Sequence, residues 1–153
     1  MRELHLMAHD IRSLENVGAL FRTCDSLGVA KLWLTGYTAA PPDPRITKVA
    51  LGADKSVVFE QKTDIMELIK QFRAEGIPVY ALELTKDAID LAKFAAPDRM
   101  ALIVGTETTG IPPSLIEACD GAIKITQKGI KESLNAAVAA GIACWAILDG
   151  QKG

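Results

Sequence analysis

Three short segments of the chain combine residue types that can bind a ligand or guide a proton. The first, residues 16–23 (NVGALFRT), lies in a stretch whose apolar residues recur at helical spacing, so Arg22 points roughly opposite the apolar side. An arginine can hold a phosphate through two parallel hydrogen bonds, and Asn16 is a residue type that caps helices. Taken alone, the segment is more typical of a surface arginine on an ordinary capped helix.

The second segment, residues 104–110 (VGTETTG), follows an apolar run and contains two glycines. It has the form GxExxG rather than GxGxxG, and Glu107 would repel a pyrophosphate where a dinucleotide-binding loop has its second glycine. The chain also lacks the GxxxxGK(S/T) pattern of a P-loop. The segment is typical either of backbone that closely approaches an uncharged or cationic ligand, or of a tight turn between a strand and a helix.

The third segment, residues 128–135 (KGIKESLN), precedes the last helical stretch. Ser133 is expected to cap that helix, and Asn135 to project from its first turn. The helix itself (AAVAAGIACWA) is poor in bulky side chains, so it favours close approach by another backbone, either of the same chain or of a second subunit. Taken alone, this segment is typical of a plain capping loop.

Apolar runs alternate with helical patterns along the chain, which predicts an α/β fold with a mostly parallel sheet flanked by helices. We expect strands at residues 3–8, 31–35, 57–60, 78–84, 100–104 and 122–125. We expect helices at 15–27, 45–51, 64–74, 112–118 and 134–148, one or two helical turns at 87–94, and a proline-rich loop at 36–44. Ligands of such sheets bind beyond the carboxyl ends of the strands, so the loops after Val104 and Ile125 are the expected site.

The composition is that of a globular protein, with 49% hydrophobic and 24% charged residues, and the length predicts a single domain over residues 1–153. The three cysteines, Cys24, Cys119 and Cys144, form no metal-binding pattern and are expected to be reduced, partly buried thiols, so no metal site is predicted. The chain has no apolar run of the ~18–20 residues that a membrane span needs and no apolar signal core, which predicts a cytoplasmic protein that does not bind a membrane.

The net charge of −2 argues weakly against a nucleic-acid-binding protein, because such proteins are often basic. The charge is unevenly distributed, however, with a net charge of 0 over residues 1–60, −4 over residues 61–123 and +2 over residues 124–153. The excess of acidic over basic residues therefore lies in the middle of the chain, away from two of the three segments, which weakens the objection.

In their order and separations, the three segments resemble the motifs of the SpoU/TrmH branch of the SPOUT RNA methyltransferases, namely NxGxxxR, GxExxG and SLN at the start of a C-terminal helix. Residues 48–57 (KVALGADKSV) are also similar to a segment of that family, and the resemblance covers nearly the whole chain. The chain differs at residues 125–127, where Ile-Thr-Gln stands in place of Ile-Pro-Met, so the proline that stiffens this loop in the family is absent.

The resemblance implies an enzyme that transfers a methyl group from S-adenosylmethionine to a ribose 2′-hydroxyl of tRNA or rRNA, working as a homodimer without a metal. It implies a C-terminal deep trefoil knot, in which loops 105–110 and 126–133 hold the cofactor. Unlike many members of the family, the chain is expected to have no accessory RNA-binding domain. Two alternatives remain open: a non-catalytic RNA-binding or ribosome-assembly protein on the same fold, and a nucleotide-binding or hydride-transferring α/β enzyme.

The same resemblance implies roles for individual residues. Arg22 is the catalytic arginine, facing the cofactor of the other subunit, and Asn16 positions it or the ribose. The other expected members of the catalytic pocket are Glu107, Ser133 and Asn135. The expected cofactor-binding residues are Gly105, Gly110, Ile125, Ser133 and Leu134, with Leu82 or Leu84 lining the adenine pocket. The expected RNA-binding residues are Arg12, Arg22, Arg45, Lys48, Lys128 and Lys131.

These residue types fit the implied reaction. A sulfonium methyl group is already electrophilic, so the protein has to align the ribose hydroxyl with it and provide for the departing proton. Arginine side chains are awkward bases because they titrate above about pH 12, but they bind phosphate with two hydrogen bonds. We therefore expect Arg22 to hold the phosphate beside the target ribose, with either that phosphate or a transiently deprotonated Arg22 accepting the proton.

Overall fold

The computed structural model describes residues 2–106, 109–130 and 133–150. Within these residues, seven strands form one sheet in the order β3-β2-β1-β6-β4-β7-β5, and every neighbouring pair is parallel. The strands are β1 (Glu3–His9), β2 (Lys31–Thr35), β3 (Phe59–Lys62), β4 (Val79–Leu82), β5 (Ile89–Asp90), β6 (Arg99–Val104) and β7 (Gly121–Lys124). The predicted α/β class with a parallel sheet is confirmed.

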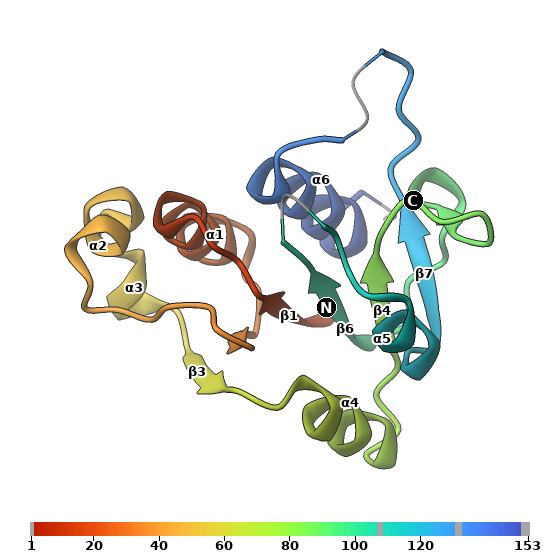
Figure 1. Cartoon of the computed structure of the whole chain (residues 1–153), viewed down its shortest axis with the longest axis horizontal. Helices are drawn as coiled ribbons and strands as arrows, with labels where there is room; N and C mark the ends of the chain where they lie inside the picture. The colour runs from red at the N-terminus through yellow and green to blue at the C-terminus, as the bar shows by residue number, and fades with distance from the viewer. Residues whose placement is uncertain (1, 107–108, 131–132, 151–153) are drawn as a thin grey trace.

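Helices cover both faces of the sheet (Figure 1). One face carries α1 (Leu14–Leu27), α2 (Pro44–Ala50), α3 (Ala53–Ser56) and α6 (Ala136–Leu148), and the other carries α4 (Ile65–Ala74) and α5 (Pro113–Ala118). Alternate residues of the strands supply the two core layers: Leu6 packs in the layer of α1 and α6, whereas Met7 packs in the layer of α4 and α5. No helix of the described residues is long and apolar enough to cross a membrane.

Strand β6 lies at the centre of the sheet, between β1 and β4. Residues 100–104 are all buried, as expected for a parallel strand that is covered on both faces. Ala81 of β4 pairs with Ile103 of β6 and with Ala122 of β7, so the carboxyl ends of these three strands lie side by side. The loops that follow them therefore meet at one edge of the sheet, as predicted.

The prediction for residues 87–94 is wrong in part. This stretch holds the two-residue strand β5 and a single 3₁₀ turn, η1 (Leu91–Lys93), rather than helical turns alone. Helix α3 is absent from the prediction, because its four residues are too few to show a helical apolar repeat. Strand β3 begins at Phe59 rather than at residue 57, since the Val57 N–H closes α3 by donating to the Ala53 carbonyl at 2.9 Å.

Helix α1 begins with Ser13 as its cap, not with Asn16, because the Ser13 hydroxyl accepts a hydrogen bond from the Asn16 N–H at 3.1 Å. Helix α2 crosses α1 at Gly18. A Cβ atom at Gly18 would lie 2.7 Å from the Ile46 carbonyl oxygen and 2.8 Å from Val49 Cβ. The glycine of the first segment therefore lets the two helices meet backbone to backbone.

All three cysteines are free thiols, two of them buried and Cys119 partly exposed. Burial raises the pKa of Cys144 to about 12 and that of Cys119 to about 11, so both stay protonated near neutral pH. Among the described residues, no group of three or more His, Cys, Asp or Glu side chains is placed to hold a metal ion.

Candidate active site

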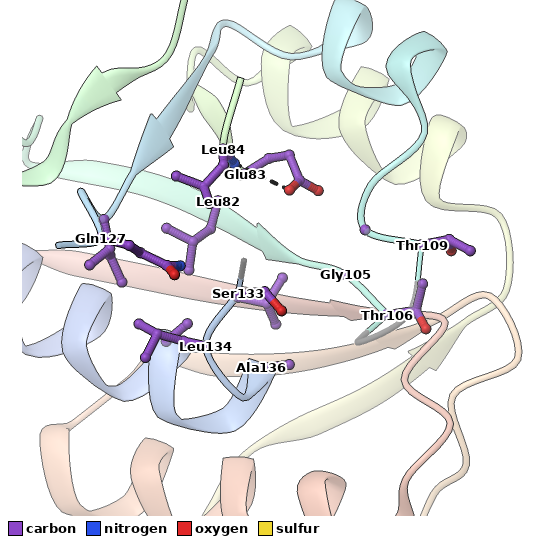
Figure 2. Close-up of a pocket in the computed structure, with 14 residues that line it drawn as sticks. Leu82, Glu83, Leu84, Gly105, Thr106, Thr109, Gln127, Ser133, Leu134 and Ala136 are labelled. Atoms are coloured by element: carbon purple, nitrogen blue, oxygen red, sulfur yellow. Dashed lines mark hydrogen bonds between the residues drawn. The ribbon is translucent and has the colours of Figure 1, made fainter. Parts of the chain in front are cut away.

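A cavity of about 310 Å³ opens at the sheet edge where β4, β6 and β7 end (Figure 2). The start of α6 and the segment before it complete its wall. All seven residues that the sequence predicts to bind the cofactor line this cavity, including both alternatives for the adenine pocket: Leu82, Leu84, Gly105, Gly110, Ile125, Ser133 and Leu134. The structure thus brings together residues from three distant parts of the chain.

One wall of the cavity is the loop that follows β6. Gly110 adopts a φ of 70°, and its N–H donates to the Thr106 carbonyl at 3.1 Å, so the loop closes back on itself. A Cβ atom at Gly105 would lie 2.5 Å from Ile111 Cγ1, which requires a glycine at the stem as well. Glu107 lies outside the described residues, and its place in the pocket stays a prediction.

The opposite wall is the chain between β7 and α6. The Thr126 hydroxyl donates a hydrogen bond to the carboxylate of Asp90 at the start of η1, and this bond lowers the pKa of Asp90. A side-chain hydrogen bond therefore anchors the loop at the residue where the family's proline is missing. The next residue, Gln127, lines the cavity, and Figure 2 shows its side chain reaching into the space between Leu82 and Leu134.

The predicted cap of the last helix is wrong. Helix α6 begins at Ala136 and is capped by Asn135, whose side-chain oxygen accepts from the N–H groups of Ala137 at 2.9 Å and Val138 at 3.1 Å. Asparagine is a strong capping residue, and here it satisfies two of the helix's unpaired donors. Ser133 lies in the cavity wall instead.

Asn135 also connects this region with α1. Its amide nitrogen donates to the side-chain oxygen of Asn16 at 3.3 Å. Both asparagines line a shallow hollow between α1 and α6 that also includes Ala19 and Trp145. Arg22 is exposed on α1, three residues after Ala19, and does not occur among the described residues that line the cavity of the same chain.

The predicted RNA-binding residues fall into two groups. Four exposed side chains lie on or beside α1 and α2: Arg12, Arg22, Arg45 and Lys48. Of these, Arg45 forms an ion pair with Asp43 at 3.2 Å, and the hydrogen bonding in this pair lowers the pKa of Asp43. Lys128 lies on the loop after β7, which Figure 1 shows on the far side of α6 from α1. Lys131 lies outside the described residues.

Several residues that line the cavity are missing from the predicted set, and the longest polar side chains among them are Glu83 and Gln127. Glu83 follows β4, and its carboxylate accepts a hydrogen bond from the Ile111 N–H at 2.7 Å. The sequence does carry a signal for Glu83, since it is the acidic residue inside the apolar run at 78–84 (PVYALEL), near the carboxyl end of a strand.

The cavity is lined by both apolar and polar groups. Leucine and isoleucine side chains offer contacts for a flat apolar ring, while hydroxyls, one amide and the backbone of two loops offer hydrogen bonds. Its volume of about 310 Å³ lies in the range of small-molecule sites. A cavity of this size and lining can hold a small ligand that has both apolar and polar groups.

The fold and the site define an α/β protein with a ligand cavity between the loops that follow its central strands. The chain matches the SpoU rRNA Methylase family over residues 3–145, and it belongs to that family. The resemblance predicted from the three segments is confirmed.

Three relatives place the chain within this family. It is 30% identical over 142 residues to the tRNA (guanosine(18)-2′-O)-methyltransferase of Aquifex aeolicus, covering 92% of this chain and 66% of that protein. It is 33% identical over 141 residues to the 23S rRNA (guanosine-2′-O-)-methyltransferase RlmB of Vibrio parahaemolyticus, covering 91% of this chain and 56% of that protein. The fold is similar to the SpoU methyltransferase AviRb of Streptomyces viridochromogenes in complex with the cofactor AdoMet, with a TM-score of 0.86, 25% identity, and coverage of 97% of this chain and 58% of that chain. The chain thus spans between 56% and 66% of the length of these three relatives.

Proposed function

We propose that this protein is an S-adenosylmethionine-dependent methyltransferase that acts on a ribose 2′-hydroxyl of tRNA or rRNA. The observation that carries the proposal is the cavity, around which all seven predicted cofactor-binding residues lie. Two relatives are named as guanosine 2′-O-methyltransferases of tRNA and rRNA, and a third was solved with AdoMet bound, which supports both the cofactor and the acceptor.

The residues of the cavity fit S-adenosylmethionine. The backbone of Gly105, Ile125 and Leu134 would hold its adenosine, with Leu82 or Leu84 against the adenine. The apolar walls suit a flat base, and the two glycine-containing stems of the loop after β6 allow close backbone approach. When bound, this cofactor supplies an electrophilic methyl group on a sulfonium, so the protein's own task is to position the acceptor.

Arg22 would position the acceptor by gripping the phosphate next to the target ribose with two parallel hydrogen bonds. Either that phosphate or a transiently deprotonated Arg22 then takes the proton that leaves the 2′-hydroxyl. Asn16 and Asn135 are hydrogen-bonded to each other at 3.3 Å. They would help to position the target ribose, or Arg22, relative to the cofactor cavity. Glu107 and Ser133 complete the proposed pocket.

We also propose that the protein is a homodimer in which Arg22 of one subunit serves the cavity of the other. The hollow between α1 and α6 supports this, because apolar side chains are exposed beside it: Trp145 at 55%, Val138 at 52% and Ile142 at 42%. Small residues between them, Ala137 and Gly141, would let another helix approach closely. In such a dimer, Arg22 of the partner subunit would be available to the cavity of this chain.

The third structural proposal is a deep trefoil knot at the C-terminal end. The segment before α6 shares a cavity with the loop after β6, and α6 then packs on α1, β1 and η1. This return path past the loop after β6 is the feature that supports a knot.

Methyl transfer from isotopically labelled S-adenosylmethionine to tRNA and rRNA transcripts tests the activity, with the modified ribose mapped by reverse transcription at low nucleotide concentration. We expect labelling that is lost in Arg22→Ala and kept in the control Lys70→Ala, whose side chain is exposed on α4. Absence of S-adenosylmethionine binding at millimolar concentration would refute the proposal. RNA binding without cofactor binding would favour a non-catalytic RNA-binding protein.

Analytical ultracentrifugation tests the homodimer. We expect a dimer at micromolar concentration and a monomer after Trp145→Lys, which puts a charge on the exposed face of α6. A monomeric wild-type protein that methylates RNA at full rate would contradict the shared site.

A further inference from the structure

We propose that Glu83 is a positioning residue for the cofactor. Its carboxylate fastens the loop after β6 to the end of β4 and so holds one wall of the cavity in shape. Glu83 lies outside the three motifs. The cofactor part of this inference rests on the proposed function, whereas the loop part stands on contacts within the chain.

The backbone of Glu83 is fixed by the sheet. Strand β4 lies between β6 and β7, and the Glu83 N–H donates to the Ile123 carbonyl of β7 at 2.9 Å, which prolongs the pairing beyond Leu82. Successive side chains of a strand point to opposite faces. Leu82 packs in the layer of α6, so Glu83 turns toward the α5 face, and Figure 2 shows the two side chains diverging.

The carboxylate meets the loop that leads into α5. Its Oε2 atom accepts a hydrogen bond from the Ile111 N–H at 2.7 Å, and its Oε1 atom accepts one from the Leu84 N–H at 3.2 Å. A hydrogen bond from a backbone N–H to a carboxylate is about twice as strong as one between neutral groups. This contact therefore ties Ile111 firmly to the end of β4.

Gly110 completes the contact. A Cβ atom at Gly110 would lie 2.3 Å from Glu83 Oε2, and the φ of this residue is 70°, so both the contact and the backbone require glycine. The Gly110 N–H in turn donates to the Thr106 carbonyl at 3.1 Å. Glu83 is thus linked through Ile111 and Gly110 to Thr106, and both Gly110 and Thr106 line the cavity.

Loss of the carboxylate leaves the Ile111 N–H without this acceptor and allows the loop to leave the shape that this contact holds. The cofactor would then have to order the loop as it binds, which lowers affinity but leaves the chemistry of the bound complex unchanged. The expected signature is a higher Kd for S-adenosylmethionine at a nearly constant turnover under saturating cofactor.

The test compares Glu83→Ala, Glu83→Gln and the control Glu117→Ala, whose side chain is exposed on α5. Amide hydrogen exchange at Ile111 is followed by NMR, and the Kd for S-adenosylmethionine by calorimetry. We expect Glu83→Ala to speed exchange at Ile111 and to raise the Kd by about tenfold or more. Glu83→Gln keeps a side-chain oxygen that accepts from Ile111, so both values should stay within about threefold of wild type.

Gly110→Ala should also speed exchange at Ile111, because its Cβ would displace the carboxylate and its φ of 70° is unfavourable for alanine. Unchanged exchange and unchanged Kd in Glu83→Ala would overturn the inference. So would a Glu83→Gln variant that keeps Ile111 protected yet binds cofactor as weakly as Glu83→Ala, since the charge would then act on the ligand directly. If the wild-type protein itself binds no S-adenosylmethionine, the proposed function fails, and the exchange measurement still decides whether Glu83 holds the loop.

Discussion

Replacing Gly18 by alanine separates the packing role of this motif glycine from its low helix propensity. Gly18 lies inside α1, and alanine is favoured over glycine in a helix interior by about 0.8–1.0 kcal/mol. At Gly18, however, the new Cβ would lie 2.7 Å from the Ile46 carbonyl oxygen, 2.8 Å from Val49 Cβ and 3.2 Å from the Ala50 nitrogen. Two of these atoms are backbone atoms of α2, which cannot rotate away as the end of a long side chain can.

The steric cost should exceed the gain in propensity. Overpacking of a well-packed site costs about 1–3 kcal/mol, so the net loss in the free energy of unfolding is about 1 kcal/mol at the middle of that range. For a chain of this size, a loss of about 1 kcal/mol lowers Tm by about 2–4 °C. We therefore expect Gly18→Ala to be less stable than the wild type, against the trend for glycine-to-alanine changes in helices.

Thermal and urea unfolding followed by circular dichroism provide the measurement. The matched control is Gly129→Ala, because no atom lies within 4 Å of a Cβ at that position and its φ is not in the left-handed region. The control should be as stable as the wild type or more stable by about 0.4–1 kcal/mol, through the unfolded state alone. If Gly18→Ala raised Tm by the amount that helix propensity predicts, the close contact between α1 and α2 would be refuted.

Three further predictions concern the site and the thiols. Arg22→Lys keeps the charge but loses the paired hydrogen bonds to phosphate, so we expect the rate of RNA methylation to fall about tenfold or more, with an unchanged Kd for S-adenosylmethionine. Methylation at nearly the wild-type rate would show that the two parallel hydrogen bonds are not needed. Thr126→Val removes the hydrogen bond to Asp90 and should weaken cofactor binding about three- to fivefold, as measured by calorimetry. Thr126→Ser keeps the hydroxyl and should bind the cofactor as the wild type does. Equal affinities of the two variants would contradict the anchoring role of Thr126. Burial raises the pKa of Cys144 to about 12 and that of Cys119 to about 11. Iodoacetamide at pH 8, with labelling read by mass spectrometry, should therefore modify neither thiol in the folded protein and both thiols in urea. Rapid labelling of these thiols in the folded chain would contradict the burial argument.

The sequence predicts the elements that repeat an apolar pattern often enough to be recognised. Strand β6 and helix α1 belong to this class, because five successive buried residues or an amphipathic pattern over 14 residues leave little choice of structure. The two residues of β5 and the four of α3 are too short to carry such a pattern. Their structure is decided by neighbours in space, since β5 exists only by pairing with β7.

The site likewise has a part that the sequence predicts and a part that it does not. Parallel strands bring their carboxyl ends to one edge, so the loops after β6 and β7 can be assigned to a shared cavity from the order of elements alone. The contacts that give these loops their shape join residues far apart in the chain, as Glu83 joins Ile111 and Thr126 joins Asp90. No local pattern encodes such pairs. The location of the site is therefore predictable from a single sequence, whereas the contacts that hold its loops in shape are not.

The cap of α6 illustrates how a motif residue is misread without its partner in space. Ser133 and Asn135 are both good capping residues, and helix propensity cannot choose between them. The choice falls on Asn135, whose side chain caps the helix and also donates to Asn16 on α1. The motif asparagines are thus part of the packing between α1 and α6. Gly18 likewise allows the backbone of α2 to approach α1, and Gly110 leaves room for the Glu83 carboxylate.

This packing role limits what the motif residues indicate about function. A chain that keeps Asn16, Gly18, Gly110 and Asn135 has kept the shape of the site, and it would need them even if it only bound RNA. Arg22 differs from the four, because it is exposed on α1 and is not one of the described residues that line the cavity in its own chain. The folding of a single chain does not call for an exposed arginine at this position, whereas the proposed shared site does. The Arg22→Lys experiment therefore bears on catalysis itself, whereas substitutions at the other motif residues would affect stability and activity together.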